Sequence, residues 1–187
     1  MARVHPGETV GSWMMKGLID YLTSDTDEVI FLRDNYIFKI IPMLNPDGVI
    51  AGNYRTSLAG CDLNRRWANP SEVLHPEIYY AKNMILKNAS QRQVALVCDL
   101  HGHSDKFNIF MYGNTINNTP LACKLYPYIL SKVNNTFFYN YCNFKMQKSK
   151  KSTARINLFE ELNDVPNVFT MEASFAGQNY VSILYDY

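Results

Sequence analysis

Residues suited to metal chemistry lie almost at the start of the sequence, in the stretch Val4-His5-Pro6-Gly7-Glu8. Pro6 and Gly7 indicate a turn, which lets the side chains of His5 and Glu8 point into one small volume. An imidazole nitrogen and a carboxylate oxygen are both common zinc ligands. Helical zinc motifs instead place two histidines at i and i+4, so this pair would form a site in a loop. A turn with a helix-capping acid is the simpler alternative for so short a pattern.

A third metal ligand is expected where the apolar run 94–100 ends. His101 follows this run directly, and His103 is its rival two positions later. The two side chains would share a face if the strand continued, whereas Gly102 indicates that it stops. Asp99 is placed to orient a ligand histidine through its second ring nitrogen. Either histidine would complete the three protein ligands that a catalytic zinc usually has, unless both are ordinary polar residues at a strand end.

Three arginines lie in the loop-rich region between positions 53 and 67. They occur in Asn53-Tyr54-Arg55 and in Gly60-Cys61-Asp62-Leu63-Asn64-Arg65-Arg66-Trp67. A guanidinium can bind a carboxylate through two parallel hydrogen bonds, so the cluster indicates an anion-binding site. The alternative is a solvated surface loop, which is the usual environment of arginine.

Glu172 lies at the end of another apolar run, in Thr170-Met171-Glu172-Ala173-Ser174. A carboxylate there would be partly desolvated, which raises its pKa and suits it to accept a proton from water at a metal. The alternative is a glutamate that faces solvent at a strand end.

The composition is that of a soluble globular chain of one domain. The sequence has 187 residues, with 47% hydrophobic residues, 19% charged residues and a net charge of +1. This balance gives no general attraction to nucleic acid or to an anionic membrane, and no apolar run has transmembrane length. The four cysteines have no Cys-x-x-Cys spacing, so free thiols in a reducing compartment are expected. Asn117-Asn118-Thr119 fits an N-glycosylation acceptor, which is expected to stay unmodified because no secretory leader precedes it.

Helix and strand patterns alternate along the chain. We expect helices at 9–22, 76–87, 120–133 and 155–162, strands at 36–42, 94–100, 108–112 and 167–172, a strand end at 1–4 and a turn at 45–48. No repeat or low-complexity linker divides the sequence. The pattern predicts an α/β fold, with a mixed, largely parallel sheet sandwiched by helices and functional groups at the strand ends.

Five motifs occur in order: His-Pro-Gly-Glu, Asn-Pro-Asp-Gly, Gly-x-Asp-Leu-Asn-Arg-x-Trp, Asp-Leu-His-Gly-His-Ser and Thr-Met-Glu-Ala-Ser-Phe. Together they resemble the zinc metallocarboxypeptidases, and their form is similar to that of the cytosolic carboxypeptidase subfamily, which removes glutamates from tubulin and other acidic tails. The resemblance covers residues 3–175. It implies one zinc ion bound by His5, Glu8 and His101, with His103 outside the ligand set.

The resemblance also implies roles for the residues that act on substrate. Arg55 would polarise the scissile carbonyl and stabilise the oxyanion. Asn64 and Arg65 would hold the terminal carboxylate of the peptide, and Glu172 would serve as general base and acid. The substrate-capping tyrosine of the family has no match, because the corresponding region near Lys150 is rich in lysines.

Arg155 is expected to select the side chain of the terminal residue. By resemblance, the segment at 154–162 lines the pocket for that side chain, and an arginine there matches a glutamate. Lys145, Lys148, Lys150 and Lys151 would draw acidic tails towards the cleft. The alternative is a surface ion pair between Arg155 and a neighbouring glutamate, at position 160 or 161.

The sequence departs from the family pattern at its ends. The resemblance implies further strands before the first motif and a longer segment after Glu172, so we expect residues 1–187 to form a single, partial catalytic domain, incomplete at the N-terminus. The expected function is removal of C-terminal glutamate from protein tails such as those of tubulin, in the cytoplasm and in association with the cytoskeleton. Two alternatives are a zinc-dependent deacylase of N-acyl amino acids and an inactive fragment that acts as a binding module.

Overall fold

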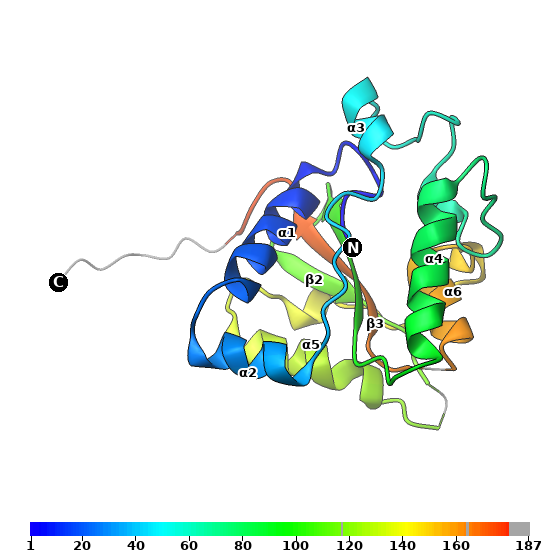
Figure 1. Ribbon diagram of the computed structural model, residues 1–187. Coiled ribbons are helices and arrows are strands. Elements are labelled where there is room, and N and C mark those ends of the chain that lie inside the picture. The colour runs from blue at the N-terminus through cyan, green and yellow to red at the C-terminus, as the bar shows by residue number, and fades with distance from the viewer. Residues whose placement is uncertain (117, 164, 180–187) are drawn as a thin grey trace.

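The computed structural model of the chain describes residues 1–116, 118–163 and 165–179 (Figure 1). The acceptor Asn117 and the tail 180–187 lie outside these residues. The described sheet has three strands in the order β1-β3-β2, which span Val97–His103 (β1), Val168–Ser174 (β3) and Ile109–Tyr112 (β2). β1 runs parallel to β3, and β2 runs antiparallel to it. The sheet is therefore mixed, as predicted.

Helices cover both faces of this sheet. The helix α1 (Thr9–Leu22), followed by α2 (Asp27–Asn35), lies on one side, and α4 (Pro76–Ala89) and α6 (Ala154–Glu161) lie on the other (Figure 1). The remaining elements are α3 (Pro46–Ala51), α5 (Ala122–Val133) and the short 3-10 helices η1 (Leu63–Arg65), η2 (Tyr139–Tyr141) and η3 (Lys148–Lys150). In the described part of the chain, no helix combines the length and hydrophobicity that crossing a bilayer requires.

Alternation along the strands separates packing residues from site residues. Leu100 packs against Met15 of α1, and Phe169 lies in a second apolar cluster with Met111. The intervening positions point to the opposite face, so that His101 of β1 lies directly beside Glu172 of β3. One face of the strands thus holds part of the core, and the other carries chemistry at the carboxyl ends of β1 and β3.

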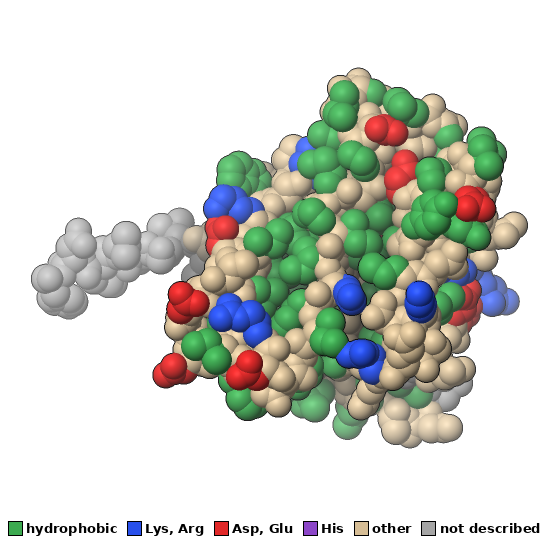
Figure 2. All heavy atoms as spheres, viewed as in Figure 1, with side chains coloured by type: hydrophobic (Ala, Val, Ile, Leu, Met, Phe, Trp, Pro, Cys, Tyr) green, Lys and Arg blue, Asp and Glu red, His purple; other side chains and the backbone are tan. Residues whose placement is uncertain are grey.

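The strand expected at 36–42 is not formed. At its end this segment lies beside Ala2, whose N–H donates a hydrogen bond to Ile41 O (3.0 Å), and Ala2 in turn forms a bridge with Leu100 of β1. Most of its apolar side chains are exposed, with Ile37 60% accessible, whereas Ile41 is partly buried against the core. Figure 2 shows apolar side chains gathered over the middle of the face in view. The prediction of a strand at 36–42 was wrong because an apolar run indicates only that its side chains favour burial. A strand also needs a neighbouring strand with which to pair.

Other boundaries differ at the start of the chain. The strand end expected at 1–4 is a single bridge between Ala2 and Leu100. The turn expected at 45–48 begins the helix α3, where the Asn45 side chain caps the helix by accepting from Gly48 N–H (3.0 Å). The helix α2 was not predicted. Only Val29 of its residues is buried, so its sequence lacks the apolar face by which a helix is recognised.

Candidate active site

Three side chains from distant parts of the sequence converge at the carboxyl end of β1. The ligand atoms of His5, Glu8 and His101 all lie within 4.8 Å of one another, and all three residues are buried. One Glu8 oxygen is 2.7 Å from His5 Nδ1, and the other is 2.9 Å from His101 Nδ1. Two imidazole nitrogens and a carboxylate are the donor set of a catalytic zinc site, so these residues fit that ion.

The turn that carries His5 and Glu8 is held by the two loops beside it. Gly7 N–H donates to Tyr54 O (2.7 Å), and a Cβ atom at Gly7 would lie 2.4 Å from the Tyr54 ring. Asn45, at the start of α3, donates to Val4 O (3.1 Å). A glycine is therefore required at position 7, and the Asn-Pro-Asp-Gly motif supports the first motif.

Each histidine is oriented through its second ring nitrogen. His5 Nε2 lies 3.0 Å from Asp62 Oδ1, and His101 Nε2 lies 2.7 Å from Asp99 Oδ2. Carboxylates in this position set the ring orientation and leave the Nδ1 atoms towards Glu8. The interaction of Asp99 was expected from its position, whereas Asp62 was given no role, although it stands within the Gly-x-Asp-Leu-Asn-Arg motif.

His103 lies outside the cluster. Contrary to the expectation from Gly102, β1 continues to His103. The His103 Nδ1 atom accepts hydrogen bonds from the backbone N–H groups of Asp105 (3.1 Å) and Lys106 (3.2 Å), and its ring packs against Phe110. These loop contacts engage the Nδ1 atom of His103, which lines the cleft but does not belong to the group of His5, Glu8 and His101.

Charges within the cluster keep Glu8 in the form that binds a metal. Burial favours the neutral acid, but hydrogen bonds from His101 and His5 outweigh it and hold the pKa of Glu8 well below its usual range. Burial likewise works to lower the pKa of His101, yet Asp99 and Glu8 raise it well above its usual value. Glu8 is therefore an ionised carboxylate, as metal coordination requires.

Glu172 has the opposite electrostatic environment. It is only 9% exposed, and among the described residues its Oε2 atom has no hydrogen-bond partner. Burial raises its pKa to about 7, with His101 acting to lower it and Glu8 adding to the rise. A carboxyl group with a pKa near neutrality can both accept and return a proton.

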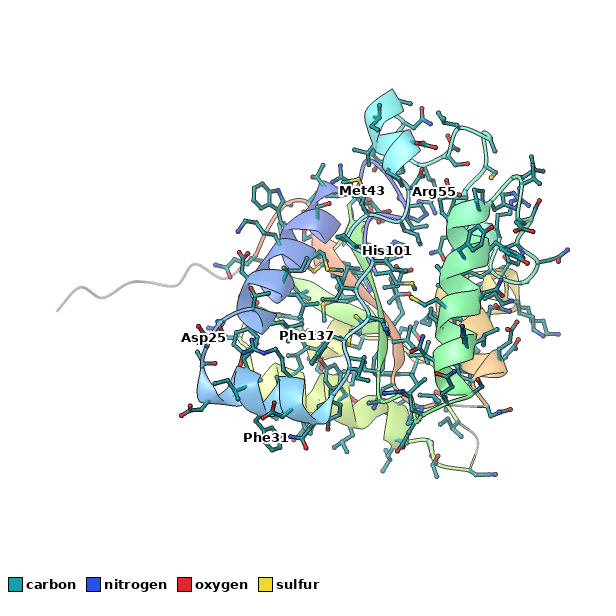
Figure 3. All side chains as sticks on the ribbon, viewed as in Figure 1. Asp25, Phe31, Met43, Arg55, His101 and Phe137 are labelled. Atoms are coloured by element: carbon teal, nitrogen blue, oxygen red, sulfur yellow. The ribbon has the colours of Figure 1, made fainter. Side chains whose placement is uncertain are left out.

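Arg55 lies between the histidine cluster and solvent. Its Nε atom donates to Asp62 Oδ2 (2.9 Å), and its Nη1 atom is 3.8 Å from Glu8 Oε1. Arg55 and His101 line the same cleft and lie near one another below α3 (Figure 3). The guanidinium is therefore held by Asp62 beside the position that a metal would occupy.

Asn64 and Arg65 are anchored by the buried residues on either side of them. Leu63 and Trp67 are fully buried, which fixes the loop against the core. Asn64 Oδ1 accepts the Ala154 N–H (3.0 Å), and Arg65 Nη1 donates to Asn64 O (2.9 Å). The loop is thus a packed structure, and the Asn64 amide presents its donor end to the cleft.

Arg155 is buried at the start of α6. Its Nη1 atom donates to Gly113 O and to Asn114 Oδ1 (2.5 Å). Burial lowers its pKa to about 10, so it stays charged at neutral pH. The surface pair considered as the alternative is not formed, since Glu160 and Glu161 pair with other residues, Lys151 and Lys82.

A single cleft of about 470 Å³ gathers these groups. It is lined by all the residues expected at the site, namely His5, Glu8, Arg55, Asn64, Arg65, His101, Arg155 and Glu172. Tyr54, Lys106 and Tyr112 also line it and were not predicted. Tyr112 could have been found from strand alternation, because it follows Phe110 on the face that carries Glu172, whereas the position of Lys106 depends on a loop.

Comparisons with known proteins agree with this geometry. A family profile described as zinc carboxypeptidase matches residues 1–156. Cytosolic carboxypeptidase 2 of Xenopus tropicalis is 48% identical over 180 residues, which cover 94% of this chain and 18% of that protein. Cytosolic carboxypeptidase 1 of Homo sapiens is 47% identical over 192 residues, covering 94% and 16%. The chain therefore spans less than a fifth of the length of these relatives.

The fold also resembles that of a protein whose crystal structure is known. The crystal structure of a metallo-carboxypeptidase from Burkholderia cenocepacia superposes with a TM-score of 0.80 at 24% identity, covering 93% of this chain and 46% of that one. Both structures have a mixed sheet with helices on its two faces. Because the family profile covers most of the sequence, including His5, Glu8 and His101, the chain belongs to the zinc carboxypeptidase family.

Proposed function

We propose that this chain carries the active site of a zinc carboxypeptidase that removes C-terminal glutamate from acidic protein tails, such as those of tubulin. The observation that carries the proposal is the single cleft in which a three-ligand cluster, the buried Glu172 and several cations meet. The names of the relatives, cytosolic carboxypeptidases, support the reaction class and a cytoplasmic location. Association with the cytoskeleton would follow from tubulin as substrate.

His5, Glu8 and His101 would hold the zinc ion. When bound, zinc supplies Lewis acidity, which polarises the scissile carbonyl and acidifies water. Asp62 and Asp99 keep the two imidazole rings in the orientation that presents Nδ1.

Proton transfer would be carried out by Glu172. Its carboxylate accepts the proton of the attacking water and then donates it to the leaving amine, which its raised pKa permits. Arg55, fixed by Asp62, places a positive charge beside the developing oxyanion.

Asn64 and Arg65 would bind the terminal carboxylate of the peptide. An amide N–H and a guanidinium together match the two oxygens of a carboxylate. A clamp for a free carboxylate in the cleft restricts cleavage to the last peptide bond, which is what distinguishes a carboxypeptidase from an internal protease.

Arg155 would recognise the side chain of the terminal glutamate. Both of its observed hydrogen bonds involve Nη1, and a guanidinium carries five N–H donors. The rest of the cleft has the same sign of charge, because Arg55, Arg65, Lys106, Lys145 and Lys150 also line it, against the carboxylates of Glu8 and Glu172. Such a cleft favours an acidic tail.

The test compares otherwise identical peptides that end in Glu or Leu, using the zinc-loaded full-length protein. We expect the Glu peptide to be preferred in kcat/KM, and Arg155→Met to lower its cleavage about 10–100-fold more than that of the Leu peptide, as loss of a charged hydrogen bond implies. Arg66→Met is the matched control, because Arg66 is exposed and lies outside the residues that line the cleft. An equal loss on both peptides would refute the role of Arg155.

An N-acetylglutamate substrate in the same assay separates the proposed reaction from deacylation. Both reactions use a free carboxylate in the substrate, so Asn64 and Arg65 suit either one. Preference for N-acetylglutamate over the peptides would favour the deacylase, and cleavage of none of them by a folded, zinc-loaded protein would favour a binding module.

A further inference from the structure

Lys106 lies in the loop between β1 and β2 and is held in an unusual aromatic environment. Its Nζ atom is 4.6 Å from the centroid of the Phe110 ring, 5.6 Å from that of Tyr141 and 5.8 Å from that of Tyr112. It also donates a hydrogen bond to Tyr141 O (3.3 Å). Aromatic faces attract an ammonium group, so this half-buried side chain is fixed rather than solvated.

The Lys106 ammonium and the arginines of the cleft have different partners. Asn64 accepts a hydrogen bond from the backbone N–H of Ala154, and this places the proposed carboxylate-binding pair, Asn64 and Arg65, next to Arg155. Lys150 belongs to this group, because burial and then the charges of Arg65 and Arg55 lower its pKa. Lys106 instead follows the strand that carries His101 and is surrounded by aromatic rings.

We infer that Lys106 binds the acidic side chain of the residue that precedes the cleaved one, an inference that rests on the proposed function. The terminal carboxylate and the terminal side chain are already matched by the clamp and Arg155. An ammonium carries three donors, and the bond to Tyr141 uses one of them, so Lys106 can bind a further carboxylate. An acidic tail supplies one at the preceding residue.

Tyr112 places Lys106 within reach of neighbouring positions on a bound peptide. Its ring centroid lies 5.8 Å from the Lys106 Nζ atom, and the carbonyl of the next residue, Gly113, accepts a hydrogen bond from Arg155. Successive residues of an extended peptide advance by about 3.3–3.6 Å. Two cations that share one tyrosine as neighbour can therefore meet two consecutive acidic side chains.

Immobilisation makes Lys106 selective. A free lysine loses rotamer freedom when it binds a ligand, whereas the three rings have already restricted this side chain. Lys106 therefore discriminates between a carboxylate and its neutral isostere, in addition to contributing to the general positive field of the cleft.

The experiment uses the zinc-loaded full-length protein and two peptides that differ only before the terminal glutamate, one ending in Glu-Glu and one in Gln-Glu. We expect the wild type to prefer Glu-Glu about tenfold in kcat/KM, as one charged hydrogen bond implies. Lys106→Met should bring this ratio to about one, and Lys106→Arg should restore most of it, because the charge is retained.

Two matched variants define the outcomes. Lys132→Met removes another lysine that lies over a tyrosine ring, Tyr128, on the exterior helix α5, and should leave the ratio unchanged. Lys145→Met removes a neighbouring lysine of the cleft; if it abolishes the preference while Lys106→Met does not, the assignment to Lys106 is overturned.

The assay distinguishes an error in this inference from an error in the proposed function. Equal cleavage of both peptides by the wild type overturns the role of Lys106 and leaves the carboxypeptidase intact, whereas cleavage of neither peptide overturns both. Calorimetric binding of the two peptides to Glu172→Gln, with and without Lys106→Met, measures the same preference without turnover. Equal affinities in the presence of Lys106 would also overturn the inference.

Discussion

Two glutamates of the cleft show how the environment of a residue decides its chemistry. Glu8 accepts hydrogen bonds from His5, His101 and the backbone N–H of Gly102 (2.9 Å), and its pKa falls well below its usual range although burial opposes this. Glu172 is equally buried, lacks a partner at Oε2, and has a pKa of about 7. The two environments suit Glu8 to bind a cation and Glu172 to transfer a proton, as proposed above.

At the residue scale, Glu172→Gln should retain zinc and lose turnover. The amide has nearly the same shape but cannot shuttle a proton, so we expect kcat to fall about 10²–10⁴-fold. Metal analysis and a peptide assay of the same sample give the two quantities. Glu160→Gln is the control, since Glu160 lies at the surface, 3.8 Å from Lys151, and outside the residues that line the cleft. A Glu172→Gln protein with near-normal turnover would rule out the role of the carboxylate.

A second residue-scale prediction concerns the stability of the metal-free protein. The pKa of Glu172 is raised from 4.5 to about 7 on folding, so its protonated form favours the folded state. This contribution is complete below pH 4.5 and is lost as the pH rises through 7.

Between pH 5 and 8, the free energy of unfolding of the wild type should therefore decrease relative to that of Glu172→Gln, by on the order of 3 kcal/mol. Urea unfolding in the presence of a chelator measures both proteins at each pH. A constant difference across this range would show that Glu172 titrates at an ordinary pKa in the fold.

At the scale of elements, the register of two strands and the conformation of one loop decide which histidine joins the cluster that could bind a metal. β1 and β3 pair so that His101 lies beside Glu172. Alternation would place His103 on the same face, but the backbone N–H groups of Asp105 and Lys106 bind its Nδ1 atom. The strand pattern alone would allow His103 to join the cluster, but its hydrogen bonds to the loop keep it outside.

This arrangement predicts different consequences for the two histidines. His101→Ala should lower zinc affinity by at least about 10²-fold, because a three-ligand site loses a ligand. His103→Ala should leave zinc affinity within about threefold of the wild type, since its ring contacts the loop instead. Competition with a chromogenic chelator measures both. Loss of zinc from His103→Ala with retention in His101→Ala would reverse the assignment.

At the scale of the whole molecule, charge is distributed unevenly. The net charge of the sequence is only +1, yet Arg55, Arg65, Lys106, Lys145, Lys150 and Arg155 line one cleft together with two carboxylates. The overall composition gives no indication of this concentration, which arises when separate loops meet. A cleft with a low-dielectric wall strengthens such a field and draws in ligands of opposite charge.

The uneven charge predicts a dependence on salt. Between about 20 and about 200 mM NaCl, kcat/KM for a peptide with several glutamates should fall at least about threefold, because ions screen the cleft. A peptide with a neutral, apolar terminus serves as the control and should change much less. Equal salt dependence of the two peptides would show that the field of the cleft does not select the substrate.

The sequence by itself determined the family, the fold class and most of the elements. Motif residues such as His5, Asn64 and Glu172 can be recognised by side-chain type, and the order of the motifs along the chain is specific to the family. The helix α1 was correctly predicted from the spacing of its apolar residues, although Trp13, Leu18 and Tyr21 of that pattern are exposed in the structure.

Only the tertiary structure decided which of the suitable residues meet. The apolar segment 36–42 was predicted as a buried strand but forms no strand and is mostly exposed, since pairing depends on neighbours that the segment does not encode. The support of His5 by Asp62 and the contact of Lys106 with Tyr141 join residues remote in sequence, and the exclusion of His103 depends on the conformation of the loop that follows it. Spacing along a chain predicts local geometry, whereas contacts between distant segments depend on how the whole chain packs.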